Sequence, residues 1–203
     1  LPTGPHEIIT VSGKMTFWMY EGDAGCYGNK AIKTPNLDKL HSVSVRLTDF
    51  HVDPTCSPTR SALMTGRYST RTGVWHTIMG RSIMNGSELT VAEVFQSAGY
   101  ATGMYGKWHL GDQPEFLPTR QGFDYFLGLP YSDDMTHATG QRIGERLRGN
   151  QWPLLPWMEN ENVIEAPANR NQMTQRETAA ALKFIATNKN KPFFLYLPHN
   201  MPG

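Results

Sequence analysis

Hydrophobic and polar residues along the chain follow two periods, which predict a series of strands and helices. Three segments are predicted strands: 45–52, which alternates, 100–105, and the continuous apolar run 193–197, which is typical of a buried parallel strand. Four segments open with cap residues or Pro and are predicted helices: 34–40, 57–65, 90–98 and 174–188. Leu37 and Leu40 mark the buried side of the first, and the last two begin with the capping boxes 90–93 and 174–177. Because helices alternate with strands, we expect an α/β fold, a mainly parallel sheet with helices on both faces.

The segments between these elements are predicted to be irregular. Residues 68–88 are rich in Gly, Ser, Thr and Arg without a clear period, and residues 111–171 are rich in Pro and Gly. Within the second segment, residues 153–167 form either a small hairpin or irregular structure. Asp133 and Asp134 are predicted to lie in a solvated loop.

Each predicted strand is followed directly by residues that suit an anion site. Cys56 comes after the first strand, Lys107 and His109 after the second, and His199 after the third. Ligands of open α/β sheets bind beyond the carboxyl ends of the strands. Cys56 also lies at a helix N-terminus, where free backbone N–H groups favour negative charge. Arg60, one turn further on, has a planar group of donors that fits a tetrahedral oxyanion. The sequence therefore predicts an anion site at this edge.

Charge and composition narrow the class of partner. The 203 residues have a net charge of +1 at pH 7, which gives no reason to expect nucleic acid or an anionic membrane as partner. No apolar run is long enough to span a bilayer, and we expect no signal peptide within this chain. Two cysteines, Cys26 and Cys56, do not make a disulfide framework, so the cellular compartment stays undecided. The oligomeric state is not indicated either.

Two motifs in this order resemble those of the type I, formylglycine-dependent sulfatases. The first is Cys-x-Pro-x-Arg at 56–60, which continues to Tyr68, and the second is the run 99–111, which contains Gly-Lys-Trp-His. A third run, 121–132, is similar to the arylsulfatase A-like members. The resemblance implies an alkaline-phosphatase-like α/β fold, truncated because it covers the N-terminal portion of the family's catalytic domain at 22–203. Segment 1–21 is then divergent or out of frame.

The resemblance implies a nucleophile made from Cys56. In the family, a separate formylglycine-generating enzyme converts this cysteine to formylglycine. One hydroxyl of the aldehyde hydrate attacks the sulfur of a sulfate ester, and the other then releases sulfate, so that one difficult displacement becomes two easier steps. Arg60 is expected to steady the hydrate.

The other site residues are also implied by the resemblance. Lys107 neutralises sulfate oxygens, and His109 acts as the base on the second hydroxyl. His199 lies on the leaving-group side as a proton donor, and Ser132 lies near the bound substrate. Members of the family are commonly exported to lysosomes, the periplasm or the medium.

The resemblance further implies a calcium ion bound by the modified Cys56, by an early pair of aspartates and by a late Asp-Asn pair. The late pair would fall beyond residue 203, and the early pair is missing. Phe17 and Trp18 stand near its place and offer no oxygen ligand. We expect Asp23 to be a turn residue rather than a substitute ligand. Either the site is truly lost or the sequence is out of frame. GAT-GAC, which encodes two aspartates, gives Met-Thr when it is read one base late, and Met-Thr stands at 15–16.

Two other functions stay open. One is a phosphoester or phosphonate hydrolase of the same superfamily, which shares the nucleophile turn. The other is a non-catalytic relative that binds anionic sugars or a partner, which the missing aspartates favour and the surviving motif residues oppose. The sequence does not indicate the natural substrate.

We predict that purified residues 1–203 have no appreciable arylsulfatase activity. Without the cation, the charge that develops on the sulfate oxygens loses its largest stabiliser. Turnover of an aryl sulfate by this polypeptide would contradict the prediction, and resequencing the gene would show whether segment 1–21 is in frame.

Overall fold

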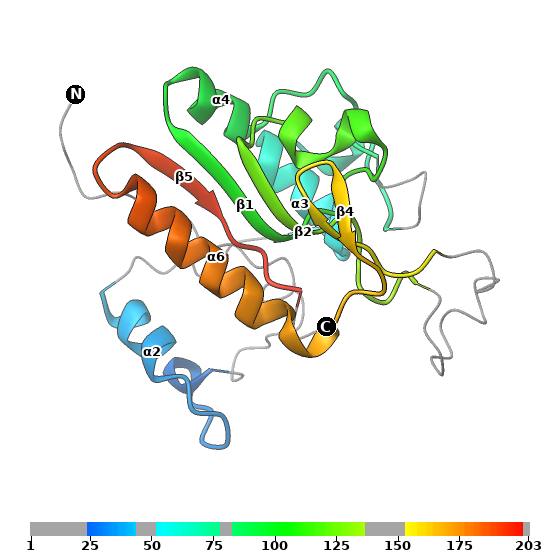
Figure 1. Ribbon diagram of the computed structural model, residues 1–203. Helices are drawn as coiled ribbons and strands as arrows, with labels where there is room; N and C mark the ends of the chain where they lie inside the picture. Colours follow the sequence, from blue (N-terminus) through cyan, green and yellow to red (C-terminus); the bar gives the residue numbers. More distant parts are fainter. Residues whose placement is uncertain (1–23, 44–51, 78–82, 137–152, 201–203) are drawn as a thin grey trace.

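Five strands form one sheet in the part of the chain that the computed structural model describes, residues 24–43, 52–77, 83–136 and 153–200. The strand order is β4-β3-β2-β1-β5 (Figure 1). The bounds of the strands are β1 Ala101–Lys107, β2 Tyr125–Leu129, β3 Trp157–Glu159, β4 Asn162–Glu165 and β5 Phe193–Tyr196. The predicted strand at 45–52 falls almost entirely outside the described residues.

The sheet is mixed, and its parallel part carries the predicted site. β1 pairs in parallel with β2 on one side and β5 on the other, so that Lys107 lies opposite Leu129 and Met104 opposite Tyr196. β3 and β4 extend the sheet as an antiparallel hairpin. The hairpin alternative for 153–167 is confirmed, whereas β2 was not predicted. The carboxyl ends of β1, β2 and β5 therefore meet at one edge.

The four predicted helices are present with small changes in their ends. The helices of at least seven residues are α2 Pro35–Ser42, α3 Cys56–Thr65, α4 Val91–Ser97 and α6 Met173–Asn188. α4 begins with the predicted capping box of Thr90 and Glu93. α3 begins two residues earlier than predicted, because its N-cap is Thr55 rather than Ser57. The capping box predicted at 174–177 is wrong, because α6 begins after Gln172 and has no side-chain cap.

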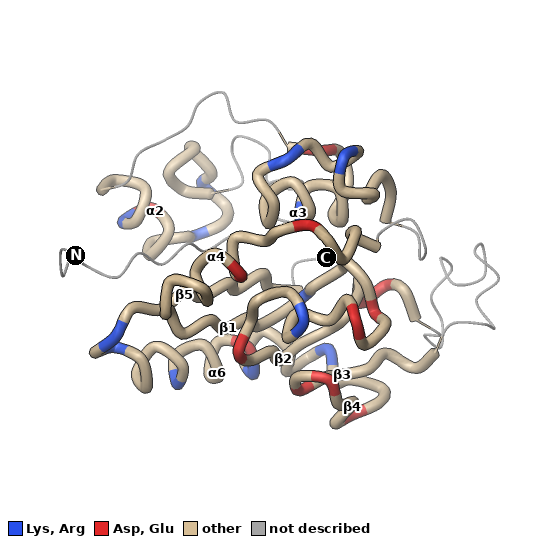
Figure 2. Tube along the Cα trace, turned by 90° about the horizontal axis from the view of Figure 1, so that it is seen from above, with Lys and Arg blue, Asp and Glu red and all other residues tan. Residues whose placement is uncertain are grey.

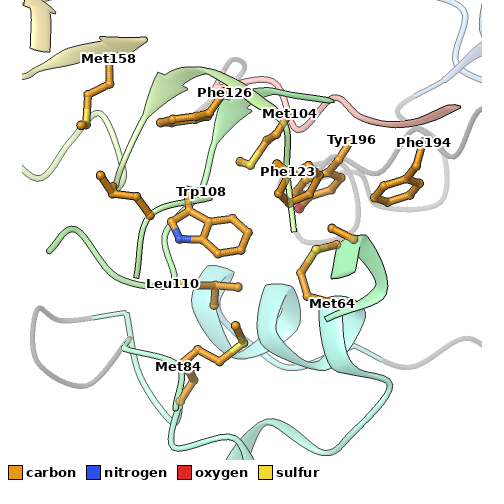
Figure 3. Close-up of a cluster of buried hydrophobic side chains, with 13 residues drawn as sticks. Met64, Met84, Met104, Trp108, Leu110, Phe123, Phe126, Met158, Phe194 and Tyr196 are labelled. Atoms are coloured by element: carbon orange, nitrogen blue, oxygen red, sulfur yellow. The ribbon is translucent and has the colours of Figure 1, made fainter. Parts of the chain in front are cut away.

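Helices cover both faces of the sheet (Figures 1 and 2). α6 packs against the face that carries Tyr105 and Phe193, whereas α3 and α4 cover the face that carries Met104 and Phe194. Neighbouring residues of a strand point to opposite faces. Because helices cover both faces, the residues on both sides of these short strands are apolar. Trp108, directly after β1, is fully buried in the α3–α4 layer (Figure 3).

The first helix departs from its prediction. Leu37 and Leu40 of α2 are 38% and 58% exposed rather than buried.

No helix in the described residues is long and apolar enough to cross a membrane.

Glycine allows the strands to approach closely at the site edge. Gly106 of β1 has φ 127°, and a Cβ atom there would meet the carbonyl oxygen of Pro198. The next residue, Lys107, donates its backbone N–H to the same oxygen at 2.9 Å. The segment after β5 is thereby bonded to the end of β1.

We predict that Gly106→Ala lowers the free energy of unfolding by at least about 3 kcal/mol, because it adds a backbone clash to a left-handed conformation. Gly99→Ala is the matched control: Gly99 has φ 82° but no atom within 4 Å of the new Cβ, so we expect a loss of only about 1–2 kcal/mol. Chemical denaturation measures both values, and equal losses would contradict the role of the close approach.

Candidate active site

A buried arginine joins the N-terminal turns of α3 to the ends of two strands. Arg60 is 1% exposed, and its Nη1 donates to the backbone carbonyl of Lys107 at the end of β1. The same nitrogen lies 3.4 Å from the hydroxyl oxygen of Tyr196 at the end of β5. Cys56 is the first residue of α3, four positions before Arg60, so both residues lie on the same side of the helix. This arginine therefore places Cys56 near the edge where β1 and β5 end.

Arg60 also has donors to spare. Its Nε and Nη2 have no hydrogen-bond partner among the described residues, and neither does the hydroxyl of Ser57. Buried polar groups are normally paired, because an unpaired buried donor costs about 1–3 kcal/mol. A guanidinium with two spare donor nitrogens, one turn from Cys56, suits the oxygen atoms of an anion.

Lys107 and Ser132, two residues that the resemblance assigns to the substrate, are in contact with each other. The Lys107 side chain is fully buried, and its Nζ donates to the Ser132 hydroxyl at 2.9 Å. Lys107 ends β1 and Ser132 follows β2, which is its parallel neighbour. The parallel pairing of the two strands therefore determines this contact.

His109 is held in an unusual backbone conformation two residues past β1. Its φ is 62°, its side chain is buried, and its Nε2 lies 3.1 Å from the carbonyl oxygen of Thr77. A carbonyl only accepts hydrogen bonds, so in the neutral ring Nε2 carries the proton. Nδ1 then holds the lone pair, as a general base requires.

His199 is paired with an acid that the sequence pattern did not reveal. Its Nδ1 lies 2.7 Å from Oε2 of Glu177, which is completely buried on α6. By its spacing from Thr174, the sequence predicts Glu177 to be part of a capping box. The helical spacing is the better indicator of its position: Met173, Glu177 and Ala181 follow one another at intervals of four residues, and all three are buried on the same side of α6. An acid within an apolar stripe indicates a specific partner.

The expectation for Asp133 is wrong. Asp133 is buried, and Arg170 lies beside it: the Arg170 guanidinium donates to the Asp133 carbonyl, and its Nε is 3.6 Å from a carboxylate oxygen. Asp134 is exposed, as predicted for a loop. The Arg170 contact therefore fastens the turn that carries Ser132.

Two tyrosine hydroxyls at this edge stay protonated at neutral pH. Burial raises the pKa of Tyr196, and the positive charge of Arg60 opposes part of that rise. Burial, followed by the negative charge of Asp112, raises the pKa of Tyr131 to about 12. Tyr196 therefore serves Arg60 as a neutral hydrogen-bond partner.

The predicted residues lie at one edge of the sheet, and their hydrogen bonds connect them to different partners. Arg60, Lys107 and Ser132 are linked to one another, whereas His199 is linked to Glu177. Cys56 has a free, partly exposed thiol.

The described residues do not fit a metal site on their own. No three His, Cys, Asp or Glu residues in the described ranges lie close enough together to hold a metal ion. Phe17, Trp18 and Asp23, which bear on the early aspartate pair, lie outside those ranges.

Comparison with known proteins gives a consistent family. The sequence model of the family Sulfatase matches residues 8–201, so the match begins within the segment 1–21 that the motifs left outside. Arylsulfatase G of Canis lupus familiaris is 38% identical over 214 residues, which cover 95% of this chain and 39% of that protein. Human arylsulfatase A is 51% identical over 119 residues, which cover 56% of this chain and 24% of that protein. This chain spans about two fifths of the length of the first of these relatives.

Solved structures confirm the predicted alkaline-phosphatase-like α/β fold. The PsFucS1 sulfatase from Pseudoalteromonas sp. has a TM-score of 0.75 at 28% identity, over 90% of this chain and 42% of that chain. The structure titled Ps i-CgsB has a TM-score of 0.74 at 28% identity, over 96% of this chain and 44% of that chain.

We predict that Ser132→Ala lowers the free energy of unfolding by about 1–2 kcal/mol, because it removes a buried acceptor from the Lys107 ammonium. Ser97→Ala, which loses only an exposed hydroxyl bonded to Val94, should change the value by less than about 0.5 kcal/mol. Denaturant titration of both variants tests the difference, and a neutral Ser132→Ala would contradict the contact.

Proposed function

Because this chain belongs to the sulfatase family, we propose that it carries the nucleophile and the anion-binding side chains of a sulfuric ester hydrolase that acts through a formylglycine made from Cys56. The observation that supports this most strongly is the buried Arg60, with two donor nitrogens unpaired in the described part of the chain and Cys56 one turn away. A surface arginine would have water as partner, and a structural one would have its donors satisfied.

Cys56 is accessible enough to be modified. Its thiol is free and partly exposed at the first turn of α3, where backbone N–H groups favour negative charge. After oxidation by a separate enzyme, the aldehyde hydrate at this position supplies the hydroxyl that attacks sulfur. Arg60 then holds the hydrate oxygen with the donors that the protein leaves unused.

Lys107 and Ser132 bind the sulfate group in this proposal. Lys107 offers a charged donor at the end of β1, and its bond to Ser132 fixes the direction of Nζ. A preorganised cation in a water-poor site stabilises developing negative charge more strongly than a mobile surface lysine would.

The two histidines move protons on opposite sides of the sulfate group. His109 takes the proton from the second hydroxyl at Nδ1. Its Nε2 stays protonated, because it donates to the carbonyl oxygen of Thr77. His199 gives a proton to the leaving oxygen. The different partners of the two rings, a backbone carbonyl and a carboxylate, suit these opposite roles.

The similar proteins favour sulfate over phosphate as the group that is cleaved, because they are arylsulfatases and an N-acetylgalactosamine-6-sulfatase. Activity assays with both kinds of ester separate the alternatives. A phosphoester hydrolase would turn over aryl phosphates in preference to aryl sulfates, and a non-catalytic binding protein would turn over neither.

We predict that Cys56→Ala, in the complete gene product co-expressed with a formylglycine-generating enzyme, lowers arylsulfatase kcat by at least about 1,000-fold, because the nucleophile is removed. Cys26→Ala is the matched control, since Cys26 is the other free cysteine of the described residues; it should leave kcat nearly unchanged.

Mass spectrometry of the peptide that contains Cys56 provides an independent readout. We expect the sulfur atom to be lost from this cysteine and retained in Cys26. A persistent Cys56 thiol together with unchanged activity in Cys56→Ala would contradict the proposed function.

A further inference from the structure

We propose that Glu177 is a positioning residue for His199: its carboxylate fixes the imidazole so that Nε2 faces the leaving-group oxygen of the sulfate ester. This inference rests on the proposed function, in which His199 protonates that oxygen. Glu177 itself does not touch the substrate.

The burial of Glu177 requires a reason. Its side chain is 0% exposed and lies between Met173 and Ala181 on the inner face of α6. Moving a carboxylate out of water costs several kcal/mol, and a leucine of similar size would pack at this position without that cost. An acid here is therefore explained by what it binds.

Both oxygens of Glu177 bind residues of the same short segment after β5. Oε2 lies 2.7 Å from His199 Nδ1, and Oε1 accepts from the side-chain amide of Asn200, which is also completely buried. Two consecutive residues thus hold the two oxygens. The plane of the carboxylate is therefore set, and with it the direction from which His199 is held.

This geometry assigns different tasks to the two ring nitrogens. An ionised carboxylate accepts hydrogen bonds only, so Nδ1 must carry a proton. Nε2 is left to gain and lose the second proton, and it has no hydrogen-bond partner among the described residues. The His199 side chain is 25% exposed although its partner is fully buried, so part of the ring is accessible.

The proton transfer balances with Glu177 unchanged. A hydroxyl oxygen of the residue-56 hydrate bonds to sulfur as the S–O bond to the leaving group breaks, and the electron pair of the broken bond stays on the departing oxygen. That oxygen takes the proton from Nε2, and the neutral ring keeps its Nδ1–H bonded to Glu177. The acid only orients the ring.

A series of aryl sulfates tests the proposal in the complete gene product. Glu177→Gln keeps the size of the side chain but removes the charge that selects Nδ1–H. For phenyl sulfate, whose leaving group needs a proton, we expect kcat/KM to fall about 10- to 100-fold. For 4-nitrophenyl sulfate, whose leaving group is stable as an anion, we expect less than about a threefold change.

Two further variants serve as controls. Glu161→Gln changes an exposed acid that is paired with Arg120, and it should leave kcat/KM unchanged for both aryl sulfates. Adding Glu177→Gln to His199→Gln should cause no further loss with phenyl sulfate, because the ring that Glu177 orients is gone. Equal losses for both aryl sulfates, or additive losses in the double variant, would show a merely structural role and overturn the proposal.

An NMR measurement keeps this inference separate from the proposed function. In histidine labelled with ¹⁵N, the neutral His199 ring should show Nδ1 protonated in the wild type and a mixture of the two forms in Glu177→Gln. This result does not require turnover, so it distinguishes an error about Glu177 from an error about sulfate ester hydrolysis. A wild-type ring protonated on Nε2 would overturn the assignment even in an active enzyme.

Discussion

The buried guanidinium of Arg60 is the interaction on which the site depends. It extends from α3 and contacts the ends of two strands through polar groups, the Lys107 carbonyl of β1 and the Tyr196 hydroxyl of β5. Apolar packing of α3 on the sheet leaves the helix able to slide, because such contacts are not directional. A planar group with fixed donor directions removes that freedom. The position of Cys56 relative to the strand ends therefore follows from the geometry of one side chain.

Three buried charged side chains, Arg60, Lys107 and Glu177, lie within the same region of strand ends. Each is costly to bury and each is held by a partner from another element. The fold meets this cost through the parallel sheet, which brings β1, β2 and β5 together with their carboxyl ends aligned. The result is a set of donors whose positions are determined before a substrate binds, and such preorganisation is how enzymes stabilise developing charge.

Much of this arrangement is predictable from the sequence, and the failures have physical reasons. The helices and the strands β1 and β5 are strongly patterned. β2 lies among Gly and Pro residues, and it becomes a strand because both neighbours bond to it, which local pattern does not show. Glu177 fits a capping box by spacing alone, yet Met173 and Ala181 place it inside. Asp133 is buried because Arg170, distant in sequence, lies beside it. Long-range partners decided the cases of β2 and Asp133, whereas the burial of Glu177 follows the helical spacing of α6.

The most direct test is a crystal structure of the complete protein with inorganic sulfate. The geometry described above predicts one sulfate beyond the carboxyl ends of β1 and β5, within hydrogen-bond distance of Lys107 Nζ and His199 Nε2 and beside residue 56. A sulfate bound elsewhere, or side chains of Lys107 and His199 that do not reach a common anion, would contradict the assignment of this edge as the catalytic centre.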